Sequence, residues 1–335
     1  MVSSVLRGVS AWTLGFLAPV TSAPAQDLRA LDAEIQQIAA TAKATIGVGI
    51  IHVESGRELF RNGDEWFPLA STYKIPIAVE VLTRVDRGEW NLDSMVPLAA
   101  QDLVPFGSVL TDRFGGSGPT GAVLSIRRYM ELMLTLSDNS ATDVLLRLMG
   151  GTAPVRERLQ TLGIEGITVS RTVQELGAEW IGFPLPPWQE RNLPRLRELM
   201  TSVKPDAHDS ANRLFYASRK DHGTPKGMGR LLAKIAKREA LSPASTDVLL
   251  EIMRRDETGL GRIRGKLPKG TLVASKTGTL ASASQNDVGI VILPDKTHLV
   301  IAVYTHGWTT EIEVEKDRVI AEIARSAYQQ FGEPK

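Results

Sequence analysis

The amino-acid sequence predicts a two-lobed α/β protein in which a helical lobe is inserted into an α/β lobe. Three observations indicate this fold. Strand-forming segments occur near both ends of the chain, the long middle part has mostly helical periodicity, and a helix is expected at each end. Since the strands of both ends can share one sheet, we place the α/β lobe at residues 26–68 and 256–335, and the helical lobe at residues 69–255.

The N-terminal elements alternate between helix and strand. Residues 27–43 have apolar side chains at helical spacing, which predicts an amphipathic helix. Residues 45–53 form an apolar run typical of a strand, and a turn at 54–57 leads to a return strand at 58–61.

The middle of the chain is predicted to be mostly helical. Two parts differ. Residues 106–121 are rich in Gly, Ser and Thr and are expected to form a surface loop, and the proline-rich residues 178–221 have no clear pattern. Residues 178–221 lie within a loop region at about 171–225. The predicted helices of this part are 126–137, 141–149, 154–162, 226–238 and 243–254.

The C-terminal part returns to strands, predicted at 272–275, 287–293 and 298–305. A last helix at 311–331 completes the α/β lobe.

Composition excludes several classes of function. The 335 residues carry a net charge of +1, so no nucleic-acid partner is expected. There is no cysteine, which excludes a disulfide or a thiol nucleophile, and the five histidines show no ligand spacing, so we expect no metal.

Residues 1–25 have the pattern of a secretory signal peptide. Arg7 precedes a short apolar run, and Ala23-Pro24-Ala25 fits a cleavage site that leaves Gln26 as the first residue. An uncleaved amphipathic leader is the alternative. We expect a periplasmic or secreted protein with no membrane contact after cleavage, acting as a monomer.

A serine and a lysine stand three residues apart at the expected start of a helix. Positions i and i+3 share one helix face, so Ser71 and Lys74 can point into one pocket. An amine that accepts the hydroxyl proton would make the serine a nucleophile. Alone, this pair means little, because Ser-x-x-Lys arises by chance in a chain of this length.

Two further signatures follow the serine. Ser137-Asp138-Asn139 lies between two predicted helices, and Lys276-Thr277-Gly278-Thr279 ends a predicted strand. Ser-x-x-Lys, Ser-Asp-Asn and Lys-Thr-Gly in this order resemble class A β-lactamases and penicillin-binding proteins. The resemblance to class A β-lactamases covers nearly the whole chain after the signal, including Met149-Gly150-Gly151 and residues 258–264. It implies an antiparallel sheet flanked by the N- and C-terminal helices, with an inserted all-helical lobe.

The resemblance also implies catalytic roles. Ser71 would attack the lactam carbonyl, and Lys74, with its pKa lowered by burial and by Lys276, would take the proton. Ser137 would pass a proton to the departing nitrogen. Lys276 would add positive charge beside Ser137 and the substrate carboxylate.

Substrate binding is implied for the same motifs. Asn139 would bind the side-chain amide of the substrate, while Thr277 and Thr279, with Gly278 between them, would hold its carboxylate. The backbone N–H groups of Ser71 and Thr279 would form the oxyanion hole. Arg262 stands where some members place a guanidinium that steers the carboxylate; a plain surface arginine is the alternative.

One part of the family pattern is broken. Members have Arg-x-Glu-x-x-Leu-Asn on a loop over the pocket, and the glutamate activates the water that hydrolyses the acyl-enzyme. The matching residues 171–177 place Val173 at the glutamate and Gly177 at the asparagine. Asp143 also replaces an asparagine that supports this loop. The loop at about 171–225 is enlarged relative to the family's, with a proline-rich insertion between residues 178 and 221. Asp221 is a candidate partner for Arg171 at the base of the loop.

Three accounts follow from this difference. Glu175 or Glu179 could reach the site and keep hydrolysis; Glu175 also has a plain surface interpretation. Otherwise deacylation is slow, as in a penicillin-binding protein. In the third account the substrate is an ester or a cell-wall peptide and Lys74 activates water. The sequence thus predicts a β-lactam-opening serine hydrolase. As the resemblance implies, we expect it to need no metal and no organic cofactor. A D-alanyl-D-alanine peptidase-like acyltransferase and a non-hydrolysing β-lactam sensor are the alternatives.

Overall fold

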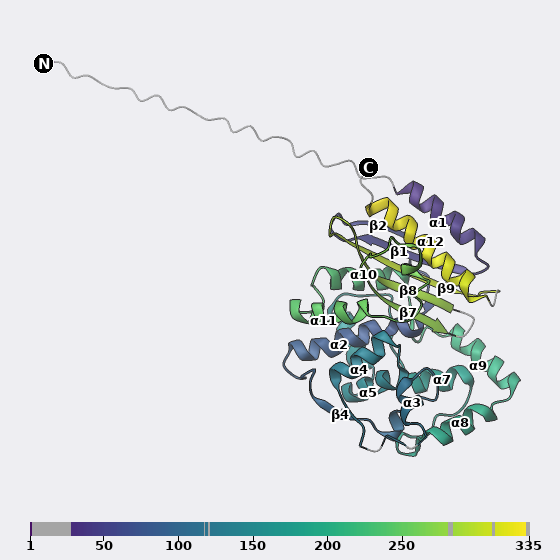
Figure 1. Cartoon of the computed structure of the whole chain (residues 1–335). Coiled ribbons are helices and arrows are strands. Elements are labelled where there is room, and N and C mark those ends of the chain that lie inside the picture. The colour runs from purple at the N-terminus through teal and green to yellow at the C-terminus, as the bar shows by residue number, and fades with distance from the viewer. Residues whose placement is uncertain (2–27, 117, 120, 281–283, 310–311, 333–335) are drawn as a thin grey trace.

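The structure, a computed structural model, describes residue 1 and residues 28–332 except 117, 120, 281–283 and 310–311. A five-stranded antiparallel sheet with the strand order β2-β1-β9-β8-β7 forms the centre of one lobe (Figure 1). This sheet and the helices around it confirm the predicted α/β fold class. The predicted signal peptide falls almost wholly outside the described residues, and the lobe boundaries stay a prediction.

The sheet joins strands from both ends of the chain, as the order of predicted elements implied. On β1, Ile50 lies opposite Ile301 of β9. Strand β7 is at the edge and extends to Leu280, so the Lys-Thr-Gly motif lies inside the strand and not at its end. The strands are β1 (Thr45–His52), β2 (Arg57–Arg61), β7 (Val273–Leu280), β8 (Ser284–Ile292) and β9 (His298–His306).

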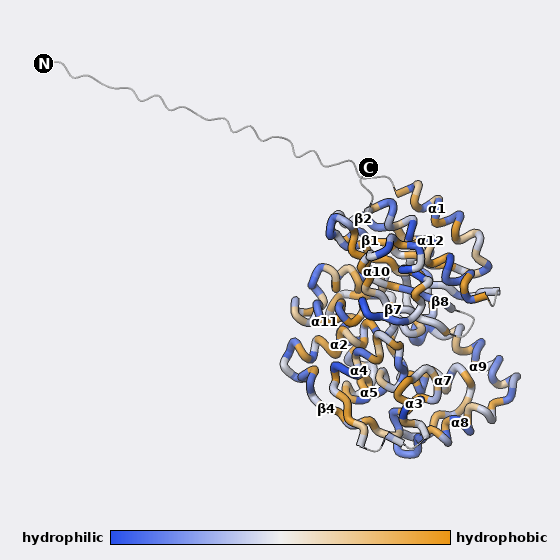
Figure 2. Tube along the Cα trace, viewed as in Figure 1, coloured by the Kyte–Doolittle hydropathy of each residue, from blue (hydrophilic) through white to orange (hydrophobic). Residues whose placement is uncertain are grey.

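Alternate residues of each strand point to opposite faces of the sheet, and both faces carry apolar side chains that are covered by helices. Helices α1 (Arg29–Thr41) and α12 (Glu313–Gly332) cover one face, where Val48 and Ile301 are buried. The other face, with Val300 and Tyr304, packs against α10 (Pro225–Ala236) and the helical lobe. The hydropathy view shows apolar residues along these strands (Figure 2).

The helical lobe is packed around α2 (Lys74–Asp86), whose residues from Lys74 to Thr83 are all buried. Its other helices are α3 (Val109–Phe114), α4 (Ile126–Thr135), α5 (Asn139–Met149), α6 (Ala153–Thr161), α7 (Val173–Ile181), α8 (Leu193–Ser202), α9 (Pro205–Ala217) and α11 (Pro243–Arg254). Short 3₁₀ turns are η1 (Ala70–Tyr73), η2 (Ala100–Asp102), η3 (Trp188–Glu190) and η4 (Ile263–Lys266). Two small sheets pair β3 (Phe67–Pro68) with β6 (His222–Gly223) and β4 (Met95–Pro97) with β5 (Val123–Ser125).

Two segments differ from the sequence prediction. The expected surface loop at 106–121 contains helix α3, whose first turn is capped by Ser108 accepting a hydrogen bond from the Thr111 N–H at 3.1 Å. The irregular segment 178–221 holds the end of α7 and all of α8 and α9, which lie together at one side of the helical lobe (Figure 1). Pro194 and Pro205 stand in first helical turns, where a missing N–H costs nothing, and so do not break these helices.

Within the described part of the chain, no helix has the length and apolar character needed to cross a membrane.

Candidate active site

Ser71 lies in the 3₁₀ turn η1, which runs directly into α2, as the Ser-x-x-Lys spacing predicted. The residue before it, Ala70, has φ +47°, a left-handed conformation that costs a non-glycine residue about 1–2 kcal/mol. The Thr72 hydroxyl donates to the Leu69 carbonyl at 2.7 Å and contacts the Tyr304 hydroxyl at 3.1 Å. The turn is therefore fixed on the inside, while Ser71 itself stays partly exposed.

Lys74 is fully buried beside the second motif. Its Nζ lies 2.5 Å from the Ser137 carbonyl, 3.1 Å from Ser137 Oγ and 2.8 Å from Asn139 Oδ1. Burial, followed by the nearby charge of Lys276, holds the pKa of this amine well below its usual range. A lowered pKa favours the neutral amine, whose lone pair can accept a proton from a hydroxyl.

The second motif alternates between anchoring and site-facing residues. The Asp138 carboxylate accepts hydrogen bonds from the N–H groups of Leu110 (3.0 Å) and Ala141 (2.8 Å), which fixes the segment to α3 and caps α5. Ser137 has φ +56°, a second left-handed non-glycine residue at the site. Its hydroxyl and the Asn139 amide oxygen both reach Lys74.

Strand β7 brings the third motif against η1. A Cβ on Gly278 would lie 2.7 Å from the Leu69 carbonyl oxygen, so only glycine permits this approach. Lys276 is fully buried, and no other described residue hydrogen-bonds its Nζ. Burial lowers the pKa of Lys276, while the carboxylates of Asp256 and Asp287 oppose that shift.

Arg262 is buried and is therefore not a plain surface arginine. Its guanidinium pairs with Asp317 at 2.8 Å and donates to the Thr279 hydroxyl at 2.8 Å. It also donates to the carbonyls of Gly278 and Asn286. Arg262 therefore fixes the end of β7 and places positive charge behind Thr279.

The three motifs meet at one pocket of about 280 Å³. The edge of β7 without a neighbouring strand faces it. Among the predicted site residues, the pocket is lined by Ser71, Ser137, Asn139, Thr277 and Thr279.

Val173 occupies the position of the family glutamate and begins helix α7 beside Ser71. The carboxylate of Asp143 accepts hydrogen bonds from the N–H groups of Val173 (2.6 Å) and Gln174 (3.0 Å). Burial raises the pKa of Asp143 to about 7 despite these two bonds. Asp143 thus supports the loop, and the side chain presented to the site is an aliphatic one.

Neither candidate acid for deacylation lines the pockets that contain Ser71. Glu175 forms a capping box, in which its carboxylate accepts the Thr172 N–H at 2.8 Å. Glu179 binds Arg171 at 2.6 Å and Lys220 at 3.1 Å on the outer side of α7. The Thr-x-x-Glu spacing at residues 172–175 was the signal that could have predicted the capping role.

The pairing of Asp221 with Arg171 is confirmed. The carboxylate lies 2.5 Å from the guanidinium Nε, and both side chains are at most 4% exposed. The guanidinium also stacks on the Phe215 ring of α9, 4.6 Å from its centre. The ion pair closes the base of the segment that carries α7, α8 and α9.

One contact at the site could not be predicted from the sequence. A Cβ on Gly177, at the position of the family asparagine, would lie 2.3 Å from Cζ of Phe106. The Phe106 ring therefore fills the space of the missing side chain, and its own carbonyl accepts a hydrogen bond from the Asn139 amide at 3.0 Å. No local sequence pattern links two residues so far apart in the chain.

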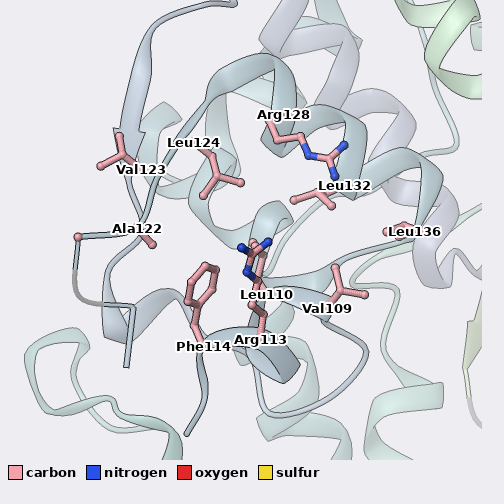
Figure 3. A pocket seen from close by; sticks show the side chains of 11 residues that line it. Val109, Leu110, Arg113, Phe114, Ala122, Val123, Leu124, Arg128, Leu132 and Leu136 are labelled. Atoms are coloured by element: carbon pink, nitrogen blue, oxygen red, sulfur yellow. The ribbon is translucent and has the colours of Figure 1, made fainter. Parts of the chain in front are cut away.

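A larger cavity of about 560 Å³ lies elsewhere in the helical lobe, between α3, β5 and α4 (Figure 3). Phe114, Leu124 and Leu132 line it, together with the side chains of Arg113 and Arg128. None of the predicted site residues lines this cavity.

The fold, the order of the three motifs and their convergence at Ser71 define a serine-hydrolase-type site on a β-lactamase fold. The chain belongs to the β-lactamase enzyme family, whose model matches residues 30–331. It is 28% identical to β-lactamase VEB-1 of Pseudomonas aeruginosa over 309 residues, covering 90% of each chain. It is also 28% identical to the extended-spectrum β-lactamase PER-1 of Pseudomonas aeruginosa, covering 89% of this chain and 86% of the relative.

Solved structures of β-lactamases superpose on this chain over most of its length. The extended-spectrum β-lactamase TLA-3 superposes with a TM-score of 0.74 at 28% identity, over 92% of this chain and 100% of the other. An ancestral class A β-lactamase gives a TM-score of 0.73 at 27% identity, over 90% of this chain and 100% of the other.

Proposed function

We propose that this protein is an exported serine hydrolase that opens β-lactams through an acyl-enzyme at Ser71 and releases the product slowly. The observation that supports it best is that the three motifs line one pocket while an aliphatic residue stands at the deacylation position. Lys74 is buried next to Ser137 with its pKa held well below its usual range, whereas Val173 lies where a water-activating carboxylate would be needed.

Acylation would begin with proton transfer from Ser71 Oγ to Nζ of Lys74. The oxygen then bonds to the lactam carbonyl carbon, and the backbone N–H groups of Ser71 and Thr279 would stabilise the oxyanion. Losing one such donor typically costs about 3 kcal/mol of transition-state stabilisation. The positive charge of Lys276 and the hydroxyls of Thr277 and Thr279 would receive the substrate carboxylate.

The lactam C–N bond breaks when its nitrogen receives a proton. The 3.1 Å contact between Lys74 Nζ and Ser137 Oγ supports a relay in which Lys74 returns the proton through the Ser137 hydroxyl. The product of this step is an ester at Ser71.

Hydrolysis of that ester needs a base that removes a proton from water. A valine side chain has no donor or acceptor. Glu175 accepts the Thr172 N–H at the start of α7 and does not line the pockets that contain Ser71. We therefore propose that the acyl-enzyme persists. The same feature favours a second candidate, a penicillin-binding-protein-like acyltransferase in which an amine takes the acyl group in place of water.

Pre-steady-state kinetics with a chromogenic cephalosporin would test the proposal. We expect a burst of ring opening with an amplitude of one per protein molecule, followed by slow turnover. Ser71→Ala should remove both phases, and Glu175→Gln, which changes a carboxylate outside the site, should leave them unchanged. The absence of a burst, together with fast linear turnover, would contradict slow deacylation.

A further inference from the structure

A second pocket adjoins Ser71 on the side of α7. Its volume is about 370 Å³, and it shares Ser71, Asn139 and Thr279 with the pocket formed by the three motifs. Apart from these polar residues and the buried hydroxyl of Tyr73, the lining is apolar. It includes Phe106, Val173, Leu176, Trp180, Ile181 and Met200.

The apolar end of this pocket depends on features particular to this chain. Val173 and Gly177 replace the two polar residues of the family pattern, and the Phe106 ring packs where a larger residue at 177 would stand. Met200 belongs to α8, in the segment enlarged relative to the family pattern. None of the residues that line the pocket is charged.

The pocket is large enough for a bulky group. A cavity of about 150 Å³ lined by apolar side chains binds benzene, so 370 Å³ can take a group of about two fused rings or an alkyl chain of similar volume. It also continues directly from Asn139, whose amide is the expected partner of the substrate's side-chain amide.

We propose that this pocket selects acyl donors with a bulky apolar group beyond the amide that binds Asn139, such as aryl or medium-chain alkyl acylamido compounds. This inference rests on the proposed acyl-enzyme at Ser71. The apolar group lies against Val173, Leu176 and Met200, and displaces water from the space beside the ester. Bulk in the acyl side chain therefore speeds acylation and slows deacylation.

The experiment compares penicillins that share one nucleus. 6-Aminopenicillanic acid has no acyl side chain, benzylpenicillin has a phenylacetyl group, and a naphthoyl penicillin has a larger one. The readout is the second-order rate constant of Ser71 adduct formation, followed by intact mass. Burying one aromatic ring should raise this constant about 10- to 100-fold over the compound without a side chain.

Two variants on α8 locate the effect. Met200→Glu puts a carboxylate at the pocket and should reduce the preference for aryl side chains at least about 10-fold, with little change for 6-aminopenicillanic acid. Thr201→Glu puts the same charge on the next, exposed residue and should keep the preference.

Equal rates for all three penicillins, or equal loss of preference in both variants, would overturn the pocket assignment while Ser71 acylation stands. No adduct with any of them would overturn the proposed function and this inference together.

Discussion

Replacing Val173 by glutamate would restore the missing carboxylate at the start of α7. Val173 is 5% exposed and lines the pocket beside Ser71. Its backbone N–H is held by Asp143, so the position of the new side chain is defined by the existing helix. A positioned general base accelerates proton transfer by about 10² to 10⁴.

The expected gain lies at the lower end of that range, about 100-fold in deacylation. Gly177 cannot supply a second polar group to orient the water, because any side chain there meets the Phe106 ring at 2.3 Å. The substitution also has a stability cost. Removing a buried valine and placing a carboxylate in an apolar pocket, near that of Asp143, should lower the unfolding free energy by about 2–4 kcal/mol.

The assay is the decay of the benzylpenicillin adduct by intact mass after excess drug is removed. Val173→Gln is the matched control, since a glutamine side chain is similar to glutamate in shape and polarity but cannot act as a base. We expect fast decay only with glutamate. Equal decay rates in the two variants would refute the reasoning that the absence of a carboxylate at this position limits hydrolysis.

Three further predictions follow from buried contacts. Because the pKa of Asp143 is raised from 3.8 to about 7, the native state binds more protons between these values, and stability should fall as pH rises from about 4 to 7. Asp143→Asn should therefore gain stability relative to wild type as pH rises from about 4 to 7 in thermal unfolding, by at most about 4 kcal/mol; a pH-independent difference would contradict this. Asp221→Asn leaves the buried Arg171 guanidinium without its closest partner and should cost about 3 kcal/mol in denaturant unfolding, whereas Glu179→Gln on the exposed side should cost under about 1 kcal/mol; equal losses would argue against the buried pair. Gly278→Ala should slow acylation more than about 10-fold with secondary structure unchanged by circular dichroism, because β7 must move away from the Leu69 carbonyl; wild-type acylation rates would show that the approach is not needed.

Much of the fold could be predicted because its signals are local. The two terminal groups of strands and the helices α4, α5, α6, α10 and α11 have clear periodicity and follow the predicted ranges closely. The prolines of the segment 178–221 hide the helices α8 and α9 in the sequence. A single sequence does not show which prolines lie in a first helical turn, where Asn192 caps the helix containing Pro194 through the Arg195 N–H at 3.0 Å.

The site residues that belong to the three motifs could be predicted from the sequence. Residues whose position depends on packing between distant segments could not. The convergence of Ser71, Ser137 and Thr279 follows from the family pattern, and the structure places them on one pocket. The dependence of Gly177 on Phe106 is a contact between distant segments that no periodicity reveals. The burial of Arg262 likewise depends on Asp317 of the last helix.

The most direct test of the central claim is the lifetime of the adduct with benzylpenicillin, measured by intact mass and located by peptide mapping. The account predicts one adduct per chain, on the peptide that contains Ser71, persisting for many minutes in buffer. An adduct that disappears within the dead time of the measurement, or that maps to another residue, would contradict it.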